Sequence, residues 1–231
     1  MIDYLRRLYT YLNRDKRLAF YVIAGLLVGF LLLTIFVQLM GVTYVDVHFS
    51  EELQEHRNPI LNALMKATSW FGDGYMPGIA VGGAAFILYL IHARREAGFT
   101  LLTLLSGIVV YGLKIAVNRP RPTADLVEVV TNAKFQSFPS GHVTFYVTFF
   151  GFLVFLMARM NWKADALRWT IGLFSLALLL AVPFSRVYLG AHWFTDVLAG
   201  FFVGLVCLMV LIRVYLSDTW RSGPVDNTIR V

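Results

Sequence analysis

The amino-acid sequence predicts an all-α, polytopic membrane protein with six transmembrane helices. The first observation behind this prediction is the composition, because 58% of the 231 residues are hydrophobic and only 15% are charged. Soluble domains average roughly 45–50% apolar and about 25% charged residues. The mean hydropathy of +0.67 points the same way. A soluble globular domain is therefore a poor match to this chain.

The second observation is a series of long apolar runs. Residues 18–40 contain no charged side chain. At about 1.5 Å per residue, a helix of this length extends roughly 35 Å, which exceeds a bilayer core of about 30 Å. Five further runs comprise residues 75–91, 99–117, 143–157, 169–184 and 197–212. No linker, internal repeat or low-complexity tract separates them, so we expect one domain over residues 1–231.

The distribution of basic residues predicts the orientation of these spans. Of the 20 lysines and arginines, thirteen precede the first run or follow the second, fourth and sixth runs. The other seven lie at the opposite ends of the runs. Cytoplasmic loops of membrane proteins carry an excess of basic residues. We therefore expect cytoplasmic termini and outward-facing loops after the first, third and fifth spans.

Residues 41–74 form an outward segment that is too long for a plain connector. Its apolar residues fall at spacings that a helix could gather onto one side, which predicts an interfacial helix. Pro59 follows Asn58 at a first-turn position and begins a second helical piece. Trp70 and Phe71 fit the aromatic enrichment found at membrane surfaces.

The net charge of +6 and the pI near 9.5 raise the question of a nucleic-acid partner. The basic residues are spread along juxtamembrane loops and form no continuous basic face with interleaved aromatic residues. We therefore expect no nucleic acid as a partner, and no obligate protein partner is evident. The single cysteine, Cys207, lies in the sixth run and is expected to be a small buried residue.

Three polar clusters lie at the outer ends of the last four runs. In the first cluster, Lys114 near the end of the third run is followed by Arg121. Pro120 and Pro122 flank this arginine and hold the chain extended. A rigidly placed arginine can bind two phosphate oxygens at once, and a lysine adds a point charge. Basic residues that only snorkel to the membrane surface would explain the same pattern.

The second cluster, Pro139-Ser140-Gly141-His142, precedes the fourth run. Ser140 can cap the helix, and Gly141 lets the backbone approach a ligand. Backbone N–H groups at the start of a helix bind anions. An ordinary capped helix would explain Ser140, but it gives His142 no purpose at the membrane edge.

The third cluster places Ser185 and Arg186 at the end of the fifth run, with His192 and Asp196 at the start of the sixth. Because they are four residues apart, His192 and Asp196 are expected on one face of a helix. A carboxylate that accepts from one ring nitrogen leaves the other nitrogen free to act as a nucleophile. A purely structural His–Asp pair is the alternative, which two ionisable groups at the head of an apolar helix disfavour.

A catalytic zinc ion is another way to use the same side chains. His142, His192 and Asp196 would suit such an ion with one open coordination position. The cations Lys114, Arg121 and Arg186 would repel it. We therefore favour a site without a metal, and we expect no cofactor.

Together, the three clusters resemble the three-part signature of the type 2 phosphatidic acid phosphatases. All three parts match in order: Lys114-x6-Arg121-Pro122, Pro139-Ser140-Gly141-His142 and Ser185-Arg186-x5-His192-x3-Asp196. The six-span layout agrees with the integral membrane branch, which includes bacterial phosphatidylglycerophosphate, undecaprenyl diphosphate and lipid A phosphatases. The resemblance implies a protein of a bacterial inner membrane, with its active site on the outer side.

The resemblance also implies a role for each site residue in a metal-independent lipid phosphatase. His192 would attack phosphorus and form a phosphohistidine, Asp196 would orient that imidazole, and His142 would protonate the leaving oxygen. The phosphoryl oxygens would be held by Lys114, Arg121, Ser140, the backbone N–H of Gly141, and Arg186. The substrate would be the mono- or diphosphate of a membrane lipid, whose tail stays in the bilayer.

Other functions remain open from the sequence. A phosphohistidine can pass its phosphoryl group to water or to another acceptor, so a lipid phosphotransferase is an alternative. Binding of a phospholipid without chemistry is a second alternative, although the complete histidine pair argues against it. The phosphate cradle also resembles that of the vanadium haloperoxidases, but those relatives are soluble.

Overall fold

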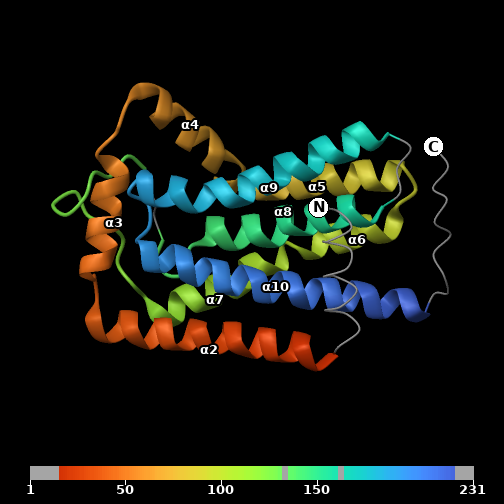
Figure 1. Cartoon of the computed structure of the whole chain (residues 1–231), viewed down its shortest axis with the longest axis horizontal. Helices are drawn as coiled ribbons and strands as arrows, with labels where there is room; N and C mark the ends of the chain where they lie inside the picture. The colour runs from red at the N-terminus through yellow and green to blue at the C-terminus, as the bar shows by residue number, and fades with distance from the viewer. Residues whose placement is uncertain (1–15, 132–134, 161–163, 222–231) are drawn as a thin grey trace.

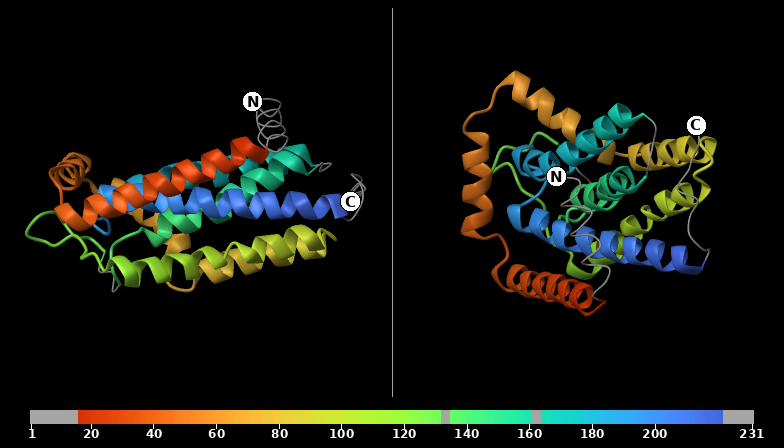
Figure 2. Two further views of the ribbon diagram at one scale, coloured as in Figure 1. Left: turned by 90° about the horizontal axis from the view of Figure 1, so that it is seen from below. Right: turned by 45° about the vertical axis from the view of Figure 1, so that its right-hand side comes forward.

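The computed structural model describes residues 16–131, 135–160 and 164–221 of the chain. Every element of regular secondary structure within these ranges is a helix, which confirms the predicted all-α class. The long helices run side by side along the longest axis of the molecule (Figure 1), and two turned views show the same bundle (Figure 2). The predicted cytoplasmic termini, residues 1–15 and 222–231, lie outside the described residues.

Within the described ranges, five of the six predicted spans are present as helices long and apolar enough to cross a bilayer. These are α2 (Lys16–Met40), α6 (Arg94–Leu102) continued by α7 (Leu105–Val117), α8 (Gly141–Arg159), α9 (Asp165–Tyr188) and α10 (Phe194–Arg221). Each predicted run lies inside its helix. The helices extend further because their ends carry polar residues that an apolar run excludes.

The predicted second span is different, because its helix is too short to cross alone. α5 (Met76–Leu90) has 15 residues, and a helix of that length covers only about 22 Å of a core of about 30 Å. It is preceded by α4 (Pro59–Ser69) and a short 3-10 helix, η1 (Trp70–Gly72). The two halves meet at an angle of 66° and are long and apolar enough only as a pair. The predicted run is thus the second half of a bent helix pair, residues 59–90, which we call the broken crossing.

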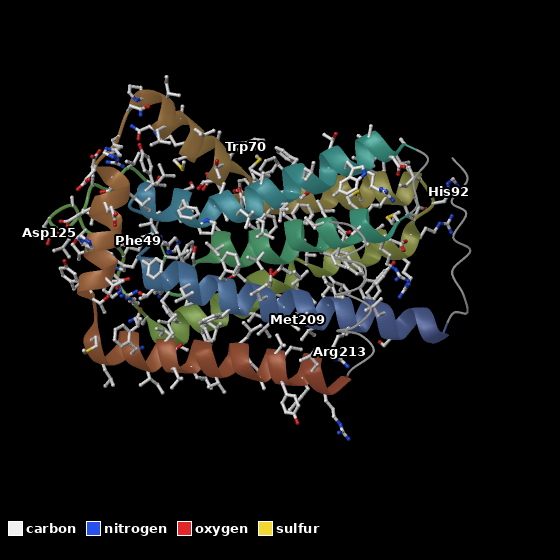
Figure 3. All side chains as sticks on the ribbon, in the orientation of Figure 1. Phe49, Trp70, His92, Asp125, Met209 and Arg213 are labelled. Carbon is white, nitrogen blue, oxygen red and sulfur yellow. The ribbon has the colours of Figure 1, made fainter. Side chains whose placement is uncertain are left out.

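The segment of residues 41–74 contains two helices, as predicted, but it is more than an outward loop. α3 (Tyr44–Gln54) lies across one end of the bundle (Figure 1). α4 begins with Pro59 after the Asn58 cap, as the sequence indicated. It then runs back along the bundle toward Trp70, which is labelled in Figure 3. The part of this segment from residue 59 onward therefore belongs to the broken crossing.

α8 is the central helix of the bundle. In the most apolar 18-residue stretch of α8, 72% of the residues are buried, whereas in the corresponding stretch of α2 only 11% are buried. α8 packs against α9 and α10. The approach of α10 is close, because a Cβ on Gly200 would lie 2.7 Å from the Ser140 carbonyl oxygen and one on Gly204 would lie 2.7 Å from Val147 Cβ. The exposed apolar side chains of α2 are suited to contact with lipid.

The two ends of the bundle differ in what they carry. α3 and the loop that contains Asp125 lie at one end, and the turn that contains His92 lies at the other (Figure 3). The first residue of α2 and the last residues of α10 both lie at the His92 end (Figure 1). α2 therefore begins, and α10 ends, at the same end of the bundle.

Candidate active site

The three polar clusters converge at the end of the bundle where α3 lies (Figure 1). Two cations come from last turns of helices, Lys114 in α7 and Arg186 in α9. The start of α8 contributes Gly141 and His142. Positive charges on Lys114, Arg121, Arg186 and His142 all act on the ring of His192. The structure therefore brings together side chains that the sequence separates by up to 82 positions, namely Lys114, Arg121, Ser140, Gly141, His142, Arg186, His192 and Asp196.

His192 lies in the bend just before α10, rather than on the helix as the spacing suggested. The difference arises because Asp196, in the first turn, accepts a hydrogen bond from the backbone N–H of Trp193 at 2.8 Å, and α10 begins only at the next residue, Phe194. His192 is only 2% exposed. Its Nε2 lies 3.4 Å from Nη1 of Arg121, so this ring nitrogen faces the cationic cluster.

The protonation of His192 is set by its surroundings. Burial lowers the pKa of His192 well below its ordinary value of 6.5, and the positive charges of Arg121, Lys114 and Arg186 lower it further. Both effects disfavour the charged imidazolium. His192 is therefore neutral near pH 7, with a lone pair available on one ring nitrogen.

The carboxylate of Asp196 lies close to both His192 and Ser137. The distance from His192 Nδ1 to Asp196 Oδ2 is 3.6 Å, longer than an ordinary hydrogen bond. Ser137 lies between them, because its hydroxyl donates to Asp196 Oδ2 and lies 3.5 Å from His192 Nδ1. Ser137 was not predicted from the sequence, although it lies only two residues before the second cluster. Such distances often shorten when a substrate binds.

Arg119 was also missed, and it is the main charge partner of Asp196. Its guanidinium donates to Asp196 Oδ1 at 2.6 Å and to Asp46 Oδ2 at 2.7 Å. Asp46 in turn accepts from the Thr195 backbone N–H at 2.9 Å. All three charged side chains are buried. This network ties α3 and the loop after α7 to the start of α10.

Among the described residues, the three predicted phosphate-binding cations donate their hydrogen bonds to neutral oxygens and form no ion pair. Lys114 Nζ donates to the carbonyl oxygen of Ser137 at 3.3 Å, and Arg121 Nη1 donates to that of Ala191 at 2.5 Å. Arg186 Nη1 donates to the hydroxyl of Ser69 at 3.0 Å. Neutral oxygens position these side chains without neutralising them. The arrangement therefore suits a ligand with several negative oxygens.

Ser140 occupies the N-cap position of α8 but does not cap it. Its side chain forms no capping hydrogen bond, and its Oγ is buried without a partner among the described residues. The backbone instead fixes this position, because the Ser140 N–H donates to the Asp196 carbonyl oxygen at 3.0 Å. The prediction that Ser140 caps the helix is thus wrong, and the hydroxyl remains available to a ligand.

His142 has a carboxylate partner that the sequence did not suggest. Its Nε2 lies 2.9 Å from Oδ1 of Asp73, which follows η1 in the broken crossing. Asp73 also borders a cavity of about 620 Å³. The described residues that line this cavity are Lys66, Ala67, Trp70, Asp73, Val130 and Thr131. An open space thus adjoins Asp73, the partner of His142.

Comparison with known proteins assigns this chain to a family. The model of the PAP2 superfamily matches residues 95–220, more than half of the chain, and this range contains all three clusters. An undecaprenyl-diphosphatase from Sulfolobus acidocaldarius is 31% identical over 191 residues, which cover 78% of this chain and 84% of that protein. The chain therefore belongs to the PAP2 superfamily, as its motifs indicated.

Further comparisons agree with this assignment. Phosphatidylglycerophosphatase B from Bacillus subtilis is 27% identical over 192 residues, 81% of this chain and 91% of that protein. Both relatives are named as phosphatases, which confirms the predicted enzyme class. The crystal structure of a transmembrane PAP2-type phosphatidylglycerolphosphate phosphatase from the same species matches the fold with a TM-score of 0.64 at 24% identity. The match covers 89% of this chain and 99% of that one.

Proposed function

We propose that this protein hydrolyses the phosphomonoester or diphosphate of a membrane lipid through a phosphohistidine, without a metal ion. The observation that carries the proposal is the buried His192, with three cations around it and Arg121 3.4 Å from its Nε2. The names of the relatives support a lipid substrate, since they act on undecaprenyl diphosphate and phosphatidylglycerophosphate.

In this mechanism Nε2 of neutral His192 attacks phosphorus. The N–P bond forms while the bond from phosphorus to the leaving oxygen breaks, and His142 gives that oxygen a proton. The leaving oxygen belongs to the lipid alcohol in a phosphomonoester and to the lipid monophosphate in a diphosphate. Water then attacks phosphorus and transfers a proton to His142, while the N–P bond breaks and inorganic phosphate leaves. Asp196, together with Ser137, orients the His192 ring from the Nδ1 side.

The remaining site residues would stabilise the charge on the transferred group. Phosphoryl transfer spreads negative charge over three equatorial oxygens and depends mainly on positioning and electrostatic stabilisation. Lys114, Arg121 and Arg186 supply positive charge, and Ser140 offers a buried hydroxyl without another partner among the described residues. A Cβ on Gly141 would make only ordinary contacts, the nearest at 3.6 Å, so the fold itself leaves room there for a ligand.

The proposal includes an orientation in the membrane. The excess of basic residues at one side supports cytoplasmic termini and a site on the outer side of a bacterial inner membrane. There the headgroup of an outer-leaflet lipid could reach His192 while its chains stay in the bilayer. A cysteine introduced at exposed Asp125 should react with an impermeant maleimide in intact spheroplasts. Reaction only after lysis would contradict the orientation.

The pH dependence of kcat/KM is expected to be bell-shaped, with its acid limb below pH 6.5. His192 must be neutral to attack, and because its pKa is lowered well below 6.5, activity is lost only when the pH falls through that lower value. On the alkaline side of the optimum the rate falls because His142 loses the proton it must donate. Initial rates from about pH 4 to 9 test this, since kcat/KM reports the free enzyme. A flat profile with rate-limiting chemistry would contradict the assigned roles.

The direct test of function is phosphate release by the purified, full-length protein in detergent. The substrates are phosphatidate, phosphatidylglycerophosphate, undecaprenyl diphosphate and lipid A, each with EDTA present and with His192→Ala as the blank. We expect release from at least one substrate, unaffected by EDTA. Loss of activity in EDTA would overturn metal independence. Loss of substrate without free phosphate, and only when a second lipid or sugar is added, would indicate a phosphotransferase.

A further inference from the structure

The broken crossing places one carboxylate against a histidine of the site. Asp73 follows η1, and its Oδ1 lies 2.9 Å from Nε2 of His142. These residues are 69 positions apart. Among the described residues, the side chain of His142 forms this one hydrogen bond, through Nε2. The other ring nitrogen, Nδ1, therefore remains open to a substrate.

The contact is held in place from both sides of Asp73. The ring of His142 lies directly on the backbone of Gly72, where a Cβ would come within 2.2 Å of the ring. One turn further along α8, Tyr146 donates to the carbonyl oxygen of Thr68 at 2.6 Å. Ser69 lies 2.6 Å from the hydroxyl of Ser185 on α9. The break between α4 and α5 is therefore docked on the two helices that begin and end at the site.

The charges around His142 make this carboxylate important. Arg186 from α9 and Arg121 from the loop after α7 bring positive charge close to the ring. Lys114 of α7 lies beside the preceding residue, Gly141, and His192 faces the same cluster. Asp73 is the negative group among them. Only a nearby negative charge favours a protonated imidazole in such surroundings.

We propose that Asp73 is the positioning residue of His142, an inference that rests on the proposed phosphatase function. Its carboxylate accepts the Nε2 hydrogen bond, fixes the ring over Gly72 and stabilises the imidazolium. Nδ1 is thereby directed to give its proton to the leaving oxygen and to recover one from the attacking water. The broken crossing then supplies a part of the active site that lies outside all three sequence clusters.

The test compares two leaving groups on the same preparation of Asp73→Asn. A lipid alkoxide needs the proton from His142, whereas the nitrophenolate of p-nitrophenyl phosphate is a much weaker base and leaves without it. We expect kcat/KM for the lipid phosphate, which reports formation of the phosphohistidine and not its hydrolysis, to fall about 10–100-fold, a part of the usual effect of general acid catalysis. For p-nitrophenyl phosphate we expect less than about a threefold loss. The ratio of the two rates does not depend on how much protein is folded.

Three further measurements complete the design. The alkaline limb of the pH profile should move to lower pH in Asp73→Asn, because the imidazolium loses its negative neighbour. Asp73→Glu should restore part of the lipid activity. Adding Asp73→Asn to His142→Ala should cause no further loss, because both act on one step. Glu52→Gln, an exposed carboxylate on α3, is the matched control and should behave like the wild type.

The outcomes separate this inference from the proposed function. Equal losses on both substrates, or no loss at all in Asp73→Asn, would overturn the role of Asp73 while wild-type activity remained. A wild-type protein without His192-dependent phosphate release would overturn the proposed function itself.

Discussion

Replacing His192 by alanine is expected to abolish phosphate release and to lower kcat/KM by about 10⁴-fold or more. The reason is that no other described side chain occupies its position between Arg121 and Ser137. Without its lone pair the N–P bond cannot form, and water would have to attack the lipid phosphate directly. Radiolabelled phosphate from the substrate should remain on the wild-type protein after rapid quenching and be absent from His192→Ala.

Two comparisons make this result specific. Arg121→Ala removes one cation and should cost less, about 10²–10³-fold in kcat, because Lys114 and Arg186 still stabilise the phosphoryl group. His56→Ala removes an exposed histidine at the start of the loop before α4 and should leave activity unchanged. If His192→Ala retained activity within about tenfold of the wild type, the phosphohistidine mechanism would be wrong.

The spans and the motifs were predictable for a physical reason. A helix in lipid must be long and apolar along its whole length, so the runs of α2, α8, α9 and α10 stand out in the sequence. Residues that share a short segment, such as Ser140, Gly141 and His142, also keep their order whatever the fold. Both kinds of information are local.

The broken crossing was not predictable from an apolar run. α4 carries Lys66 and Asn62, and η1 is followed by Asp73, so these residues look like part of a surface loop. Only packing against Tyr146 and Ser185 shows where they lie. The same holds for the contact of Asp73 with His142, since an isolated aspartate 69 positions away from its partner has no local pattern.

Asp46 and Arg119 present the same difficulty, with 73 positions between them. In the sequence, Asp46 is one acidic residue near the start of a predicted interfacial helix. Arg119 lies two residues before Arg121 and resembles another phosphate-binding cation. The structure gives it a different task, because it faces two carboxylates instead of the cationic cluster.

Arg119→Met is therefore expected to destabilise the fold by about 3–5 kcal/mol, the usual cost of removing one partner of a buried ion pair. The substitution keeps much of the side-chain volume but leaves Asp46 and Asp196, both fully buried, without their shared cation. Hydrogen bonds from Thr195 and Ser137 remain, but they carry no positive charge. Unfolding in mixed micelles with increasing dodecyl sulfate measures the change in stability.

A second substitution distinguishes lost charge balance from lost packing. Adding Asp46→Asn to Arg119→Met removes one unpaired charge, so the double variant should be more stable than Arg119→Met alone. Arg94→Met, at an exposed arginine of α6 whose guanidinium lies over the ring of Tyr89, is the control and should change stability by less than about 1 kcal/mol. Should Arg119→Met unfold together with Arg94→Met, the two carboxylates would not depend on Arg119. The attachment of α3 to the start of α10 would then have to come from the contacts of Thr195 with Asp46.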